Sequence, residues 1–117
     1  MMSLMSEAPP THHSDDAFTN GAELLKAMAH PLRLSLLASL VDEPRCVHEL
    51  VDLTGASQPM VSQHLRVLRG ADVVRSERRG REVVYSVADA HIHHIVVDTV
   101  DHIRTEGIHH DPHMHDA

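Results

Sequence analysis

Metal-binding side chains recur along the segment Asp89–Glu106, which reads DAHIHHIVVDTVDHIRTE. On a helix turning about 100° per residue, the segment's polar and apolar side chains separate onto two faces. One face carries His91, His94, Asp98 and His102, and the other carries Ile92, Val96, Thr99, Val100 and Ile103. Imidazoles and carboxylates are ligands of divalent ions such as Zn(II). The polar face is therefore a candidate metal-binding face.

The two outer histidines, His91 and His102, are too far apart to bind one ion from the same chain. Eleven positions separate them, which is roughly 16 Å at about 1.5 Å per residue, whereas a zinc–imidazole bond is about 2 Å long. A shared ion requires a second, antiparallel copy of the helix, and a two-fold dimer then has two equivalent sites. Alternatively, His94, Asp98 and His102, spaced i, i+4 and i+8, bind an ion locally or form a solvated face.

The composition indicates one domain with a modest, mainly helical core. The chain has 117 residues, and Phe18 and Tyr85 are its only aromatic residues, so the core must consist of aliphatic side chains and methionine. No apolar run approaches the roughly 20 residues of a membrane span, and the first ten residues do not resemble a signal peptide. We therefore expect a cytoplasmic protein without a membrane segment. The single Cys46 excludes an intramolecular disulfide and a multi-thiolate metal site within one subunit.

The net charge of −7 conceals one basic window. Residues 57–81 contain six arginines and two acidic residues, a net charge of +4, while the remainder contains four basic and fifteen acidic residues, a net charge of −11. This window would attract phosphate and the rest of the chain would repel it. The distribution favours nucleic-acid binding through residues 57–81.

A helix-turn-helix is predicted inside and just before this window. Residues 46–53 form a short helix with Val47, Leu50 and Val51 facing inward, and residues 54–56 form a turn containing a glycine. Ser57 is a plausible N-cap for the next helix, whose apolar face is predicted as Met60, Val61, Leu65 and Leu68. The second helix of this motif normally enters the major groove. The predicted DNA contacts on it are Ser57, Gln58, Ser62, Gln63, His64 and Arg66.

The residues on either side complete a winged arrangement. Residues 1–17 lack periodicity and are expected to form a mobile arm, and a helical pattern begins at Phe18 and is interrupted at His30-Pro31. From Val73 the period changes to 2, which predicts a β-hairpin with a basic tip. Arg78, Arg79 and Arg81 at the tip either contact phosphate and the minor groove or form a solvated turn.

This order of elements resembles the ArsR/SmtB family of winged-helix metal-sensing repressors. The resemblance covers about residues 20–106. It is carried by LLKAMAHPLRLSLLASL (24–40), CVHEL (46–50), SQPMVSQHLRVLRGADVV (57–74), RRGREVVYSV (78–87), ADAH (88–91) and DH (101–102). It implies a mainly α fold with a small β-hairpin, a winged helix-turn-helix domain at 18–106 closed by a dimerisation helix, and a homodimer. Such dimers bind an inverted-repeat operator in double-stranded DNA and release it when metal binds, so the chain is not expected to be an enzyme.

The resemblance also implies metal ligands. Family members that sense metal on the last helix resemble the pattern D-x-H-x10-H-x-x-[E/H], which Asp89, His91 and His102 match. The fourth position is Thr105, a poor ligand, so we predict Glu106 in its place, with His109 or His110 as alternatives. Four such ligands favour Zn(II), whereas extra C-terminal histidines would favour Ni(II) or Co(II). Asp89 has a simpler alternative role as the helix cap.

Two further interpretations concern the rest of the chain. Thiolate sensors of the family carry C-V-C where this chain has Cys46-Val47-His48. A second metal site would use Cys46 and Glu49 with His12 or His13 of the partner subunit. Alternatively, Cys46 is a buried structural residue. The histidine-rich tail at 107–117 would, on a rival interpretation, make the protein a metal buffer.

Overall fold

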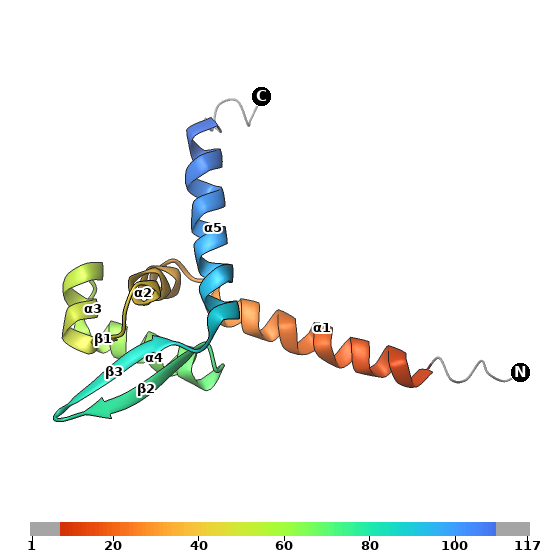
Figure 1. Cartoon of the computed structure of the whole chain (residues 1–117), viewed down its shortest axis with the longest axis horizontal. Helices are drawn as coiled ribbons and strands as arrows, with labels where there is room; N and C mark the ends of the chain where they lie inside the picture. Colours follow the sequence, from red (N-terminus) through yellow and green to blue (C-terminus); the bar gives the residue numbers. More distant parts are fainter. Residues whose placement is uncertain (1–7, 110–117) are drawn as a thin grey trace, which may run out of the picture.

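The computed structural model describes the backbone of residues 8–109 and the side chains of residues 16–105. The elements in chain order are α1 (Ala8–Met28), α2 (Pro31–Val41), β1 (Arg45–Cys46), α3 (Val47–Thr54), α4 (Gln58–Gly70), β2 (Val74–Arg79), β3 (Glu82–Val87) and α5 (Ala90–His109). Helices α2 to α4 and the sheet form one body, from which α1 and α5 extend in different directions (Figure 1). The predicted fold class, helices with a small wing, is confirmed.

The helix boundaries in the DNA-binding half follow from local sequence signals. The side chain of His30 caps α2 by accepting a hydrogen bond from the backbone N–H of Leu32 (3.1 Å), and Pro31 is the first helical residue. Gly55 ends α3 with a φ of +77°, a left-handed conformation that glycine adopts at little cost. The hydroxyl oxygen of Ser57 accepts a hydrogen bond from the N–H of Met60 (3.3 Å) and caps α4.

The core lies between α2, α3, α4, the sheet and the first half of α5. Its most buried side chains are Leu36, Leu37, Leu40, Leu50, Val61, Leu65, Leu68, Val73, Val74 and Val96. The predicted apolar face of α4 is wrong at one position, because Met60 is 43% exposed and His64 is buried in its place. Val61, His64, Leu65 and Leu68 follow the spacing i, i+3, i+4 and i+7, which defines one helix face, and Met60 lies off that face.

The sheet contains a strand that the sequence did not reveal. β1 pairs antiparallel with β3, with Arg45 opposite Tyr85 and Cys46 opposite Val84, and the strand order is β1-β3-β2. Cys46 was predicted as the start of a helix, but it ends this strand and precedes α3. A strand of two residues is too short to show alternation. β2 and β3 form the predicted hairpin, with Gly80 at a φ of +66° in its turn.

The two extended helices differ in length from the prediction. α1 begins at Ala8 rather than Phe18, and the described side chains from Asp16 to Asn20 are exposed. Exposed side chains need no apolar face, so this part of α1 shows no apolar periodicity. α5 continues through His109. Ile103, on its predicted apolar face, is 61% exposed because the second half of α5 extends beyond the body of the fold. The rest of the predicted arm and tail, residues 1–7 and 110–117, lies outside the described residues.

No single helix among the described residues is long and apolar enough to cross a membrane, and only the 90° bent pair Asp16–Met28 and Pro31–Val41 passes that test jointly.

Candidate DNA-binding and metal-binding sites

The N-terminal half of α4 presents a polar surface. Gln58, Gln63 and Arg66 are exposed, Ser62 is half-buried, and Ser57 is exposed while it also caps the helix. Short polar side chains at the start of a helix, followed by an arginine, are suited to contact base edges and phosphates. Four of the six predicted α4 contacts are therefore exposed, and Ser62 is partly exposed.

His64, the sixth predicted contact on α4, is buried and cannot be retained. Its exposed fraction is 9%, and its ring lies against that of His30, with 4.5 Å between the ring centroids. Its Nδ1 has no hydrogen-bond partner among the described residues. Burial lowers the pKa of His64, and its neighbours His30 and Arg33 lower it further. The side chain therefore belongs to the contact between α4 and the α1–α2 junction.

The wing presents its three predicted arginines to solvent. Arg78, Arg79 and Arg81 are all exposed, and the guanidinium of Arg79 forms a 3.2 Å ion pair with Glu77. At the base of the wing, Arg69 of α4 donates a hydrogen bond to the hydroxyl of Ser76 in β2 (3.2 Å). This bond joins the end of α4 to the wing, the two elements that were predicted to contact DNA.

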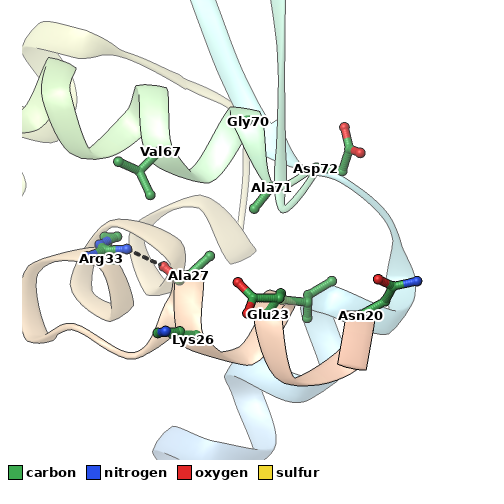
Figure 2. A pocket seen from close by; sticks show the side chains of 10 residues that line it. Asn20, Glu23, Lys26, Ala27, Arg33, Val67, Gly70, Ala71 and Asp72 are labelled. Atoms are coloured by element: carbon green, nitrogen blue, oxygen red, sulfur yellow. Dashed lines mark hydrogen bonds between the residues drawn. The ribbon is translucent and has the colours of Figure 1, made fainter. Parts of the chain in front are cut away.

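A groove of about 750 Å³ lies between α1 and the C-terminal end of α4 (Figure 2). Glu23 and Lys26 line it from α1 and Asp72 lines it from the turn after α4, while Arg33 donates a hydrogen bond to the carbonyl of Ala27 (2.8 Å). The lining contains no histidine or cysteine. This groove therefore brings together neither a nucleophile–base pair of the usual kind nor a metal-ligand set.

On α5, one chain brings together only two of the predicted metal ligands. The Oδ1 atom of Asp89 lies 3.8 Å from Nδ1 of His91, whose side chain is 92% exposed. The same Oδ1 accepts a hydrogen bond from the N–H of Ile92 (3.0 Å), so the alternative role of Asp89 as a helix cap is observed. His102 is exposed and lies eleven residues further along the same helix. The side chain of Glu106 lies outside the described residues.

The start of α3 forms a different cluster around Cys46. The Sγ atom of Cys46 lies 3.2 Å from Nδ1 of His48, and that nitrogen lies 3.9 Å from a carboxylate oxygen of Glu82 in β3. Glu49 caps α3, because its Oε1 accepts a hydrogen bond from the N–H of Cys46 (2.9 Å). Burial raises the pKa of the Cys46 thiol, and the carboxylates of Glu49 and Glu82 raise it further. The side chains of His12 and His13, predicted as further ligands, lie outside the described ones.

Glu82, which is 36 positions from Cys46, was not among the predicted metal ligands. The β1–β3 register brings it close: Cys46 is opposite Val84, and Glu82 lies on the same face of β3 two residues before Val84. Only a prediction of the two-residue strand β1 would have revealed this contact.

A helix-turn-helix with a basic wing defines a class of DNA-binding regulator, and comparison with known proteins identifies the family. Residues 30–76 match the family described as "Bacterial regulatory protein, arsR family". The chain is 48% identical over 101 residues to the HTH-type transcriptional repressor SmtB of Mycobacterium tuberculosis, covering 86% of this chain and 73% of that repressor.

Solved structures agree with this assignment. The transcriptional repressor BigR of Xylella fastidiosa has a TM-score of 0.67 and 32% identity, covering 75% of this chain and 90% of that one. A homodimeric winged helix-turn-helix domain from Mycobacterium bovis has a TM-score of 0.72 at 23% identity, covering 84% and 90%, and supports the fold. The chain belongs to the ArsR family and is a transcriptional repressor rather than an enzyme, as predicted.

Proposed function

We propose that this repressor binds an inverted-repeat operator as a homodimer and releases it when Zn(II) binds between the two α5 helices. The observation that carries the proposal is the exposed polar face of α5, with Asp89 and His91 together at its start and His102 about 16 Å further along. One chain cannot close a site from these residues. Two α5 helices that lie antiparallel in a homodimer would form two equivalent metal sites.

Apolar side chains on the extended helices support a dimer. Phe18 and Leu25 of α1 are 73% and 53% exposed, and Ile103 of α5 is 61% exposed. A mainly apolar groove of about 260 Å³ lies between α1, α2 and α5 and is lined by Leu25, Met28, Ala29, Leu34, Ile95 and Thr99. A second copy that packs against α1 and α5 would cover this surface, which otherwise leaves large apolar side chains in water.

The ligands proposed for each ion are Asp89 and His91 of one subunit with His102 and Glu106 of the other. Two imidazoles and two carboxylates suit tetrahedral Zn(II). The alternative is Ni(II) or Co(II), for which His109 or His110 would add ligands toward an octahedral site. The ligand types of these residues suit either choice.

The mechanism depends on the spacing of the two α4 helices. In the metal-free dimer they would lie about one turn of DNA apart, with Gln58 and Gln63 in successive major grooves and Arg78 and Arg81 on the flanking phosphates. Metal that joins the α5 helices would hold a dimer in which this spacing is wrong. A coupling free energy of about 1–3 kcal/mol, as is typical of allosteric proteins, or somewhat more would release the operator.

The decisive experiment titrates Zn(II), Ni(II), Co(II) and Cd(II) into a preformed complex with fluorescent operator DNA and follows anisotropy. We expect Zn(II) to release the wild-type protein, and His102→Ala to bind the operator equally well without release. His94→Ala is the matched control, because His94 belongs to the local i, i+4, i+8 set and not to the inter-subunit set. Loss of release in His94→Ala would favour a local site, and loss of operator binding in His102→Ala would make His102 structural.

A metal buffer is the second candidate function, because His109, His110, His113 and His115 fall in the last nine residues. Deletion of residues 107–117 separates the two functions. A buffer loses its metal-binding capacity with the tail, whereas a sensor built on His91 and His102 keeps its metal-dependent release.

A further inference from the structure

Two histidines from distant parts of the chain meet on the buried face of α4. The ring of His30, at the junction of α1 and α2, lies against the ring of His64, with 4.5 Å between the ring centroids and 39° between the ring planes. His30 is half-buried and His64 is buried. His64 directly follows Gln63 and precedes Arg66 by two positions. A movement of α4 that takes His64 out of this contact would therefore also move side chains proposed to contact DNA.

The surroundings of His64 favour a neutral ring. An imidazolium carries a proton on both nitrogens, whereas Nδ1 of His64 is buried and has no hydrogen-bond partner among the described residues. Protonation would place a charged N–H donor there without an acceptor from those residues, which costs free energy. In agreement with this geometry, burial lowers the pKa of His64.

The cap of α2 requires a neutral His30 as well. Nδ1 of His30 accepts a hydrogen bond from the backbone N–H of Leu32 (3.1 Å). A ring nitrogen that carries a proton cannot accept a hydrogen bond. Protonation of His30 would therefore remove the side-chain cap of α2, so both rings of the contact are suited to the neutral state.

A permanent positive charge lies beside this pair of rings. Arg33 of α2 lowers the pKa of His64, and its buried Nε has no hydrogen-bond partner among the described residues. Glu23 and Lys26 of α1 and Asp72 after α4 line the groove that Arg33 also borders (Figure 2). None of these three is among the groups that shift the pKa of His64. A proton on the imidazole would therefore add a second positive charge beside Arg33 without a stabilising carboxylate among the groups that act on it.

We infer that the His30–His64 contact is a proton-binding switch: neutral rings hold α4 in its DNA-binding position, and acidification toward about pH 5.5 separates them and releases the operator without metal. A proton can shift this equilibrium because it binds more tightly to separated rings, which reach water, than to packed ones. The inference rests on the proposed operator binding through α4 and is independent of the metal ligands on α5. It gives the repressor a second effector, the proton.

The test measures operator affinity against pH in the full-length protein with a chelator present. The probe is a duplex that the wild-type protein selects from random-sequence DNA at about pH 7.5, labelled with a pH-insensitive rhodamine for anisotropy. Ordinary electrostatics predicts tighter binding at about pH 5.5, because protonation of the 13 histidines adds positive charge. The switch acts in the opposite direction. The ratio of Kd at the lower pH to Kd at the higher pH should be greater for the wild type than for His64→Leu by about fivefold or more, the lower end of typical allosteric coupling.

A second variant and a control assign this effect to the pair of rings. His30→Asn removes the other ring while asparagine can still cap α2, so it should lose the pH response as His64→Leu does. It also carries the comparison if His64→Leu does not fold. His94→Asn removes an exposed histidine of α5 and should keep the wild-type response. Far-ultraviolet circular dichroism at both pH values checks that each protein is folded.

Three results would overturn the inference. The first is the same pH dependence of Kd in the wild type and His64→Leu. The second is a response that His30→Asn keeps, which would mean that His64 titrates without its partner ring. The third is loss of the helical signal of the wild type at the lower pH, which would make release a consequence of unfolding. Because metal is absent throughout, failure of Zn(II) to release the operator is a separate result.

Discussion

Replacing Arg79 by alanine tests whether the wing neutralises DNA phosphate. Arg79 is exposed at the end of β2, and its only ion-pair partner among the described residues is Glu77 at 3.2 Å. An exposed pair of this kind contributes about 0–1 kcal/mol, so DNA phosphate can replace Glu77 at little cost. In a dimer the substitution removes two phosphate contacts, because each subunit contributes one.

The expected magnitude follows from counterion release. Each phosphate neutralised on B-DNA adds about 0.9 to the slope of log K against log salt, so two lost contacts make the slope shallower by about 1.8. Over a fourfold change in salt, from about 50 to 200 mM, the affinity advantage of the wild type over Arg79→Ala should shrink by about twelvefold. The effect should be equal for operator and unrelated DNA, because phosphate contacts do not read sequence.

Fluorescence anisotropy at several salt concentrations measures both slopes. Arg79→Lys should keep the wild-type slope because it keeps the charge. Glu77→Gln should keep the slope while changing the affinity by less than about thirtyfold, because the dimer loses two exposed pairs of at most about 1 kcal/mol each. If the ratio of wild-type to Arg79→Ala affinity is the same at low and high salt, Arg79 contacts no phosphate and the assignment of the wing is wrong.

Three stability predictions concern the body of the fold. Leu37→Ala should lower the free energy of unfolding by about 2–5 kcal/mol in urea titrations, because Leu37 is fully buried. The control Leu53→Ala, at a side chain that is 54% exposed, should change it by less than about 0.5 kcal/mol. Gly55→Ala should lower the free energy of unfolding by roughly 1–2 kcal/mol, because alanine is strained at a φ of +77°. Gly70→Ala, at a helical position of α4, should raise it. Equal effects of the two substitutions would mean that the conformation of Gly55 does not require glycine. The lowered pKa of His64 means that the unfolded chain binds the proton more readily, so wild-type stability should fall as pH drops below about 6.5. The stability of His64→Leu should fall less steeply with decreasing pH than that of the wild type. If the two stability profiles are parallel, His64 is not the group responsible for the fall.

Local signals in the sequence were sufficient for most of the DNA-binding fold. Ser57 caps α4 and Gly55 ends α3 as predicted, because caps and turns depend on residues within four positions of each other. The hairpin at 74–87 and the polar face of α5 were likewise visible as periods of 2 and 3.6. The family assignment depends on these same short segments.

Contacts between distant segments were decided only by the tertiary structure. The spacing of His64 places it on the same face of α4 as Val61, Leu65 and Leu68, and the folded chain buries it there against His30, 34 positions earlier. Glu82 reaches the Cys46–His48 pair because a two-residue strand pairs with β3. Caps and amphipathic periods are properties of a few consecutive residues and can be recognised in the sequence. A pairing register or a ring contact depends on the path of the whole chain, so only the folded molecule reveals it.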